Sequence, residues 1–329
     1  MSALPPSAST PLPPRYRAKP LRVSCVQFDV KLGRVEENAA KVEAMTARLA
    51  PGSVDLLVLP EMALSGYMFA SPAAIAPYLE APKTGPTARL AIALAARLHC
   101  YVVAGYPEVI PGAKITKEVE AEALGVGYNS AVLAGPEGVI GNYRKTFRFE
   151  TDKTWAREGD GFAFFDLPEP LGRVGVGICM DLNPRDFIAP WNAFELATFA
   201  VDNGVDVLVV PMNWLDPAEQ DHDSDSDEDD GLAVPPRDPD APSESNLNYW
   251  AARLAPLHDP TPRYSEGGAV EPAAGKDVVF VAANRVGKEE GTTFVGTSCV
   301  MSISSVPSRI ELVEVCNRTE ERVLVAEIT

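Results

Sequence analysis

The sequence predicts one α/β domain in which two stacked β-sheets are covered by helices on their outer faces. Three observations indicate this fold class. Short apolar segments typical of strands alternate with amphipathic segments typical of helices, the strands outnumber the helices by roughly two to one, and the pattern never restarts as a second unit. The chain has 329 residues, 46% of them hydrophobic and 23% charged, which is the composition of an ordinary globular protein.

The first half of the chain contains five predicted strands and two predicted helices. Helices are expected at 35–49, where apolar residues recur on one helical face, and at 86–98, where Pro86 favours a helix start. Strands are expected where short apolar runs are bounded by turn residues, at 21–29, 55–61, 101–106, 128–135 and 138–145.

The second half repeats this alternation around one long interruption. Helices are expected over 190–203 and near 244–255. Residues 216–276 are acidic and rich in proline, and loops of this length in a compact domain are usually lids or disordered inserts. Strands are expected at 162–167, 174–181, 205–214, 277–285, 294–302, 310–315 and 322–328.

The first twenty residues form a separate predicted segment. Residues 1–20 contain six prolines and no acidic residue, and we expect a disordered leader before a single domain at 21–329. An apolar signal core is absent, so the leader does not indicate secretion. Its serines and arginines resemble a mitochondrial transit peptide, but its prolines oppose the amphipathic helix that such a peptide needs. We expect a cytoplasmic protein, with mitochondria and the nucleus left open.

The charge of the chain excludes several classes of partner. The sequence has 29 basic and 46 acidic residues, a net charge of −17, which repels nucleic acid. Eight acids lie within residues 219–230, so part of the excess belongs to one solvated loop. This loop fails as an EF-hand because Asp230 and Pro236 stand where that motif needs glycine and glutamate. The longest apolar runs are too short to span a membrane.

The cysteines and histidines argue against disulfides, metals and a serine hydrolase. The five cysteines are widely spaced with no CxxC pair, which favours a reducing compartment. The three histidines have no metal-ligand spacing, and the GxSxG motif is absent. The sequence therefore predicts neither a metal nor an organic cofactor.

Three reactive residues each follow a predicted buried strand. Glu61 follows LLVLP, Lys145 ends GVIGNYR, and Cys179 closes VGVGI. Each alone would be an ordinary strand end or core residue, but the carboxyl ends of such strands are where α/β sheets place their sites.

The segments around these residues resemble the nitrilase, or carbon–nitrogen hydrolase, superfamily. The resemblance lies in LVLPEMALSGY at 57–67, YRKTF at 143–147 and GVGICMDLNP at 175–184. The segments at 143–161, 179–197 and 207–216 are similar to the fungal protein N-terminal amidases in particular. The resemblance implies a four-layer αββα sandwich and deamidation of N-terminal Asn or Gln on polypeptides, which feeds the N-degron pathway.

The resemblance also implies a Glu–Lys–Cys triad. Cys179 is the expected nucleophile, and Lys145 with the backbone N–H of Met180 is expected to stabilise the oxyanion. Glu61 is expected to take the thiol proton and later to activate water. Glu150 resembles a second glutamate of the family that orients the lysine, although it could also be a surface residue.

The free α-amino group of such a substrate needs an oxygen partner. Asp181 is the first candidate and Asp152 the second, although Asp181 could instead cap backbone N–H groups. Asn183, Asn213 and Trp214 are expected to line the pocket and read the side-chain amide, or to pack at a strand end.

Two alternatives to the N-terminal amidase hypothesis stay open. One is a small-molecule amidase of the same superfamily, of the ω-amidase or carbamoylase type. The other is a noncatalytic scaffold whose acidic loop binds basic partners. Asn and Gln cannot be ranked because one methylene in a pocket is worth only ~1–3 kcal/mol. A monomer and a homodimer are both compatible with the apolar residues at 185–203.

Overall fold

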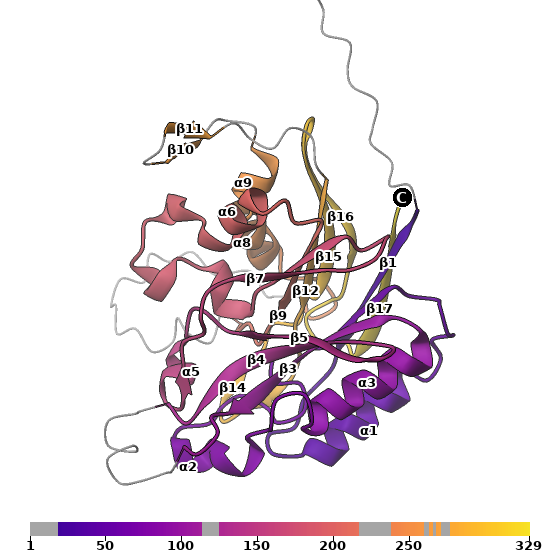
Figure 1. Ribbon diagram of the computed structural model, residues 1–329, viewed down its shortest axis with the longest axis vertical. Coiled ribbons are helices and arrows are strands. Elements are labelled where there is room, and N and C mark those ends of the chain that lie inside the picture. The colour runs from indigo at the N-terminus through magenta and orange to yellow at the C-terminus, as the bar shows by residue number, and fades with distance from the viewer. Residues whose placement is uncertain (1–18, 114–124, 217–237, 260–262, 266–267, 271–276) are drawn as a thin grey trace, which may run out of the picture.

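The computed structural model describes residues 19–113, 125–216, 238–259, 263–265, 268–270 and 277–329. These residues form two β-sheets packed face to face, with helices on the outer face of each sheet (Figure 1). This four-layer αββα sandwich in a single domain confirms the predicted fold class. The predicted leader, apart from residues 19 and 20, and the acidic run at 219–230 lie outside the described residues.

The first sheet brings the end of the second strand to its parallel edge. Its order is β17–β1–β2–β3–β4–β5, with β6 paired to β4. The neighbours β1, β2 and β3 run parallel, so their carboxyl ends meet at one edge. The strands are β1 (Leu21–Gln27), β2 (Leu56–Val58), β3 (Tyr101–Val109), β4 (Gly127–Gly135), β5 (Gly138–Arg144), β6 (Ala156–Arg157) and β17 (Arg322–Ile328).

The second sheet has the order β16–β15–β12–β9–β8–β7, with β8, β9 and β12 parallel. Two short hairpins, β10–β11 and β13–β14, lie outside the main sheets. The strands of the second sheet are β7 (Ala163–Asp166), β8 (Arg173–Val176), β9 (Val207–Pro211), β12 (Val278–Ala283), β15 (Cys299–Ser305) and β16 (Ser308–Val315). The hairpin strands are β10 (Arg263–Ser265), β11 (Gly268–Val270), β13 (Lys288–Glu289) and β14 (Thr292–Thr293).

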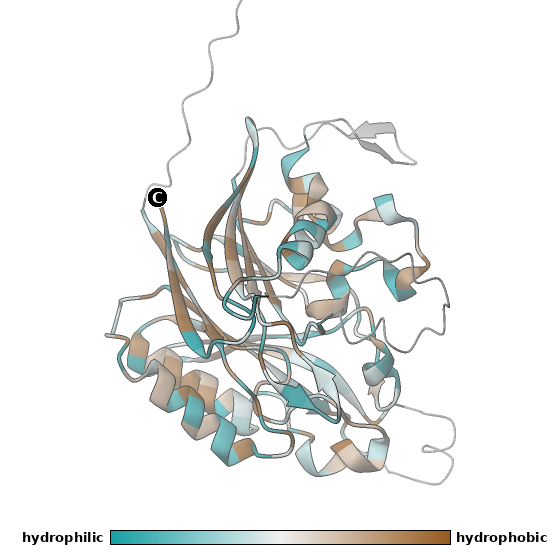
Figure 2. Ribbon diagram, turned by 180° about the vertical axis from the view of Figure 1, so that it is seen from behind, coloured by the Kyte–Doolittle hydropathy of each residue, from teal (hydrophilic) through white to brown (hydrophobic). Residues whose placement is uncertain are grey.

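Helices cover both sheets and bury the apolar sides of their strands. The helices α1 and α3 pack on the first sheet, and α6, α8 and α9 belong to the core of the second. Hydrophobic residues are concentrated on the strands, whereas the helices carry both hydrophobic and hydrophilic residues (Figure 2). The helices are α1 (Val35–Thr46), α2 (Pro72–Ile75), α3 (Pro86–Leu98), α5 (Glu150–Lys153), α6 (Glu195–Asp202), α8 (Glu244–Arg253) and α9 (Ala255–His258), with 3₁₀ turns η1 (Ala76–Tyr78), η2 (Cys179–Leu182), η3 (Arg185–Phe187) and η4 (Trp191–Ala193).

Three element boundaries differ from the prediction because residues with positive φ interrupt them. The strand predicted at 294–302 begins only at Cys299, after Gly296 and Thr297 at φ 59° and 61°. The helix predicted from residue 190 begins at Glu195, because Phe194 has a left-handed φ of 45°. The strand predicted at 174–181 ends at Val176, three residues before Cys179 and its positive φ. Left-handed backbone is incompatible with both a strand and an α-helix.

Candidate active site

Cys179 occupies a strained turn three residues after the end of β8. Its φ is 41°, a left-handed value that non-glycine residues adopt at a cost. This turn directs the chain from the buried strand into η2, and Cys179 keeps 9% of its surface exposed at the wall of a cavity. The backbone N–H of Asn213, just past β9, faces the thiol and lowers its pKa, although burial outweighs this effect. The sulfur is therefore presented at the edge where the parallel strands of the second sheet end.

Asp181 locks this turn to the segment that carries Lys145. One carboxylate oxygen accepts the backbone N–H groups of Thr146 at 3.1 Å and Phe147 at 2.7 Å. The other accepts the N–H of Ile178 at 2.8 Å and the hydroxyl of Tyr143 at 2.7 Å. Asp181, the first candidate for the substrate α-amino group, is fully buried and does not line the cavity. Its oxygens are used to cap backbone donors.

Glu61 and Lys145 form a fully buried ion pair. The Lys145 Nζ donates to Glu61 Oε1 at 2.8 Å and to Asp152 Oδ2 at 2.6 Å. Asn129 on β4 donates its amide to both carboxylates, at 2.6 Å to Glu61 and 2.9 Å to Asp152. The second oxygen of Glu61, Oε2, is buried and has no hydrogen-bond partner among the described residues. That oxygen is free to accept a proton.

A glycine on β3 makes room for Glu61. A Cβ atom at Gly105 would lie 2.5 Å from the Cα of Glu61, so only glycine allows the two backbones to approach this closely. The pairing of β2 and β3 continues beyond β2, because the N–H of Gly105 donates to Pro60 and that of Ala63 donates to Gly105. These contacts fix the Glu61 backbone against the sheet.

The second acid beside Lys145 is Asp152 and not Glu150. Glu150 does not contact Lys145; it pairs with Lys153 at 2.7 Å, and its side chain is 74% exposed. Asp152 instead holds the lysine, with no exposed surface. The structure therefore does not place Glu150 beside Lys145, and it places Asp152, the second candidate for the α-amino group, against the lysine instead. The short helix α5 turns Asp152 inward and Glu150 toward solvent.

Burial and the neighbouring charges together set the protonation states of Cys179, Glu61 and Lys145. Burial raises the pKa of Cys179 well above its usual value, and Glu61 raises it further, whereas Lys145 lowers it only in part. Burial also raises the pKa of Glu61, and Lys145 partly offsets the effect. Burial alone would lower the pKa of Lys145, but Asp152 and Glu61 together raise it well above its usual range. The resting site therefore combines a protonated thiol with a lysine ammonium.

The thiol opens into an uncharged cavity of about 450 Å³. Met180, Asn183, Asn213 and Trp214 line it, as the sequence analysis expected of the last three. Among the residues that the structure describes, the lining contains no charged side chain. The other lining residues are Tyr67, Phe149, Phe187, Leu215 and, from α8, Ser245, Asn246 and Tyr249.

Several polar atoms of the cavity wall lack partners within the described part of the chain. They are the hydroxyl of Tyr67, both amide atoms of Asn213 and the amide nitrogen of Asn246. Buried polar atoms are normally hydrogen-bonded, so unpaired ones at a cavity indicate groups that a bound molecule can satisfy. Tyr67, Asn129 and the residues of α8 were not predicted from the sequence. A single Asn within the apolar strand at 127–135 was the available signal for Asn129.

The carbon–nitrogen hydrolase family profile matches residues 22–190. The chain belongs to this family, which confirms the expected class of hydrolases acting on amide C–N bonds. The protein N-terminal amidase of Schizosaccharomyces pombe is 34% identical over 324 residues, which cover 94% of this chain and 99% of that protein. The protein N-terminal amidase of Saccharomyces cerevisiae is 31% identical over 217 residues, 59% of this chain and 45% of that protein.

Solved structures agree with the fold. A crystal structure of N-terminal amidase with a Gln-Gly peptide has a TM-score of 0.75 and 24% identity, covering 94% of this chain and 99% of that chain. A CN-hydrolase superfamily protein from Xanthomonas campestris has a TM-score of 0.59 at 19% identity.

The described residues contain neither a candidate metal site nor a candidate membrane span. In these ranges no three His, Cys, Asp or Glu side chains gather in a way that could hold a metal ion. None of the helices in the same ranges has the length and hydrophobicity needed to cross a membrane.

Proposed function

We propose that this protein hydrolyses the side-chain amide of Asn or Gln at the amino terminus of polypeptides, leaving Asp or Glu and releasing ammonia. One observation carries the proposal: the buried Glu61–Lys145 pair, in which Glu61 Oε2 has no partner among the described residues, lies within electrostatic reach of the Cys179 thiol, and that thiol lines an uncharged cavity. The near full-length similarity to the S. pombe protein N-terminal amidase supports this substrate class.

In the proposed reaction Glu61 Oε2 accepts the thiol proton and the Cys179 sulfur attacks the amide carbon. The resulting oxyanion is stabilised by Lys145 Nζ and the backbone N–H of Met180. Glu61 then gives the proton to the leaving nitrogen, and ammonia departs as the C–N bond breaks. A thioester remains on Cys179. Glu61 next takes a proton from water, whose hydroxide attacks the thioester, and the thiolate leaves with that proton.

The proposal assigns a supporting function to the buried polar partners. Asp152 and Asn129 hold Lys145 and Glu61 in their relative positions. Among the described residues, the cavity lining contains no carboxylate. We therefore assign the binding of the substrate α-ammonium group to the amide oxygen of Asn213 and to the faces of the aromatic rings at the cavity, such as Trp214. The amide of Asn183 already accepts the hydroxyl of Tyr249 at 2.6 Å, so it orients that ring at the cavity wall.

The product is a polypeptide with an acidic first residue, which would make the enzyme an early step of an N-degron pathway. Its substrates would then be proteins of the cytoplasm, and the widely spaced cysteines, all of them free, suit that reducing compartment. In this proposal a monomer or homodimer acts without a cofactor.

A peptide panel that varies only the first residue and its acetylation tests the substrate class. We expect ammonia from peptides beginning with free Asn or Gln, because the side-chain amide reaches the thiol and the α-ammonium group is bound. The N-acetylated peptides should release less than about one hundredth as much ammonia. A neutral acetamide cannot make the contacts of the α-ammonium group, and it is too large for the position that this group occupies. Ammonia release is measured by a coupled assay.

The other outcomes separate the alternatives. Equal rates on acetylated peptides would refute the assignment of the α-ammonium group. Hydrolysis of free ω-amides or N-carbamoyl compounds, with none of any peptide, would show a small-molecule amidase instead. The same peptides with Ser as residue one provide the blank.

A further inference from the structure

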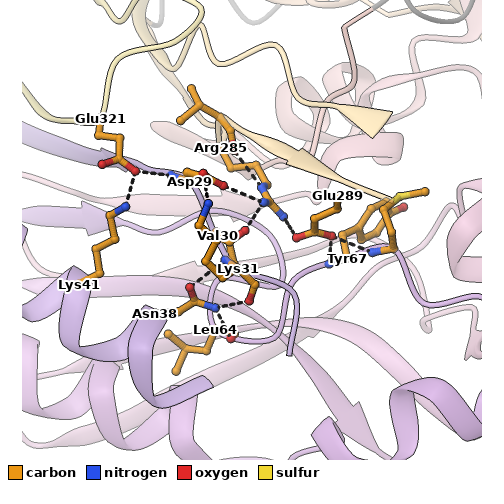
Figure 3. Close-up of polar contacts among 12 residues, drawn as sticks. Asp29, Val30, Lys31, Asn38, Lys41, Leu64, Tyr67, Arg285, Glu289 and Glu321 are labelled. Carbon is orange, nitrogen blue, oxygen red and sulfur yellow. Dashed lines mark hydrogen bonds and ion pairs between the residues drawn. The ribbon is translucent and has the colours of Figure 1, made fainter. Parts of the chain in front are cut away.

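A buried ion pair lies outside the cavity, between the end of β12 and the loop that follows Glu61 (Figure 3). Arg285 Nη1 pairs with Glu289 Oε1, and the two side chains are 0% and 2% exposed. Arg285 also donates to the carbonyl of Val30 and lies over the Phe294 ring at 4.0 Å. The pair therefore joins the second half of the chain to segments of the first half.

The other oxygen of Glu289 anchors the loop that carries Tyr67. Its Oε2 accepts the backbone N–H groups of Tyr67 at 2.9 Å and Met68 at 3.0 Å. The loop passes close by at Gly66, where a Cβ atom would lie 2.8 Å from Glu289 Oε1 and where φ is 78°. Only glycine meets both conditions. The Glu289 carboxylate thus fixes the backbone of the loop that follows Glu61 in the sequence.

Tyr67 is the side chain that this anchor places at the site. Its ring centroid lies 5.7 Å from Lys145 Nζ, and the residue lines the cavity beside Cys179. The ring is 1% exposed and its hydroxyl has no partner among the described residues, so no side-chain hydrogen bond fixes its position. Its place depends on packing and on the two backbone bonds to Glu289.

We infer that Glu289, held in place by Arg285, is a positioning residue that keeps the Tyr67 ring over Lys145 and so shields the ammonium from water. This inference rests on the triad of the proposed function. A charge attracts its neighbours more strongly where water is excluded, so the shield strengthens the effect of Lys145 on the Cys179 thiolate and on the oxyanion.

Stability alone gives little reason for this pair. Replacing a buried ion pair by apolar side chains of similar size is often neutral or stabilising, because both charges must be taken out of water. A carboxylate that accepts two specific backbone N–H groups fixes the position of that backbone, which an apolar side chain cannot do. The Arg285–Glu289 pair is thus better explained by its effect on the position of Tyr67 than by a contribution to the stability of the fold.

The test is a double-mutant cycle between Glu289→Ala and Tyr67→Ala. The readout is the rate of Cys179 alkylation by iodoacetamide, followed by mass spectrometry, with kcat and KM for an N-terminal Gln peptide beside it. We expect Glu289→Ala to slow alkylation and lower kcat about tenfold when Tyr67 is present. In the Tyr67→Ala background, Glu289→Ala should change the alkylation rate and kcat by less than about twofold. Glu289→Gln, which keeps an acceptor oxygen, should recover most of the rate.

A matched control is Glu80→Ala. Glu80 is also buried and accepts a backbone N–H, that of Thr87 at 2.8 Å, but it lies at the start of α3 and not at the cavity. Its removal should lower the melting temperature without changing alkylation. If Glu289→Ala does not fold, the double variant Arg285→Met/Glu289→Leu takes its place in the cycle. This double variant leaves no unpaired buried charge.

Equal effects of Glu289→Ala in both backgrounds would overturn the inference, as would a slowed reaction in Glu80→Ala. The alkylation readout needs no amide substrate. If coupling appears in alkylation but no peptide is hydrolysed, the proposed substrate class fails and the positioning role stands.

Discussion

Lys145→Met is expected to lower kcat/KM for N-terminal Gln peptides at least about 10³-fold and to destabilise the fold by about 3–5 kcal/mol. The two losses share one cause. Lys145 Nζ is the cation between two carboxylates with no exposed surface, Glu61 at 2.8 Å and Asp152 at 2.6 Å. Without it, both acids are buried without a counter-charge, and the proposed oxyanion loses its charged donor.

Urea unfolding and steady-state ammonia release measure the two effects. Lys153→Met is the matched control, since Lys153 is partly exposed and pairs with Glu150 at 2.7 Å and Asp186 at 3.1 Å. Surface pairs contribute about 0–1 kcal/mol, so this variant should keep its stability within that range and its activity within about twofold. Full stability in Lys145→Met would contradict the buried ion pair as the structure has it.

Cys179→Ser is expected to lose activity by about 10⁴-fold or more while the melting temperature stays close to that of the wild type. Serine fits the same strained turn, so the fold has no reason to change. Its hydroxyl is much less acidic than a thiol, and Glu61, whose raised pKa suits proton transfer from sulfur, cannot ionise it.

Cys100→Ser is the control for this substitution. Cys100 is also buried, at 2% exposure, but belongs to the core between the first sheet and its helices. Ammonia release by this variant should match that of the wild type after correction for folded protein. Substantial activity in Cys179→Ser would show that the nucleophile is a different group.

The sequence identified the residues whose position follows from strand ends. Glu61, Lys145 and Cys179 each come after a short apolar run, and parallel strands bring such ends to one edge. The structure places Glu61 and Lys145 in direct contact and Cys179 within their electrostatic reach. Their chemical roles remain proposals that the variants above test.

The sequence could not identify the partners that tertiary structure selects. Glu150 and Asp152 are two residues apart on one short helix, and the direction in which each faces decides which of them meets Lys145. Asp181 lies two residues after Cys179, but two backbone N–H groups and a hydroxyl from the distant segment 143–147, together with the nearby N–H of Ile178, take up its oxygens. Spacing along the chain carries no information on these contacts.

The same limit applies to the anchor of Tyr67. Glu289 lies 222 positions from Tyr67 in the sequence, and the fold brings the segments after β1 and β12 together, as the bridge between Asp29 and Val286 shows. A buried carboxylate that accepts two backbone N–H groups leaves no pattern in either segment. Such contacts are found only once the fold is known.

The central claim is that Cys179 attacks a side-chain amide with the help of Glu61 and Lys145. Intact protein quenched in acid during turnover of an N-terminal Gln peptide, then digested and analysed by mass spectrometry, tests it most directly. We predict that the fragment containing Cys179 gains the mass of the peptide less one ammonia, and that the N-acetylated peptide gives no such adduct. An adduct on a different cysteine, or sustained ammonia release without a thioester on Cys179, would contradict the account.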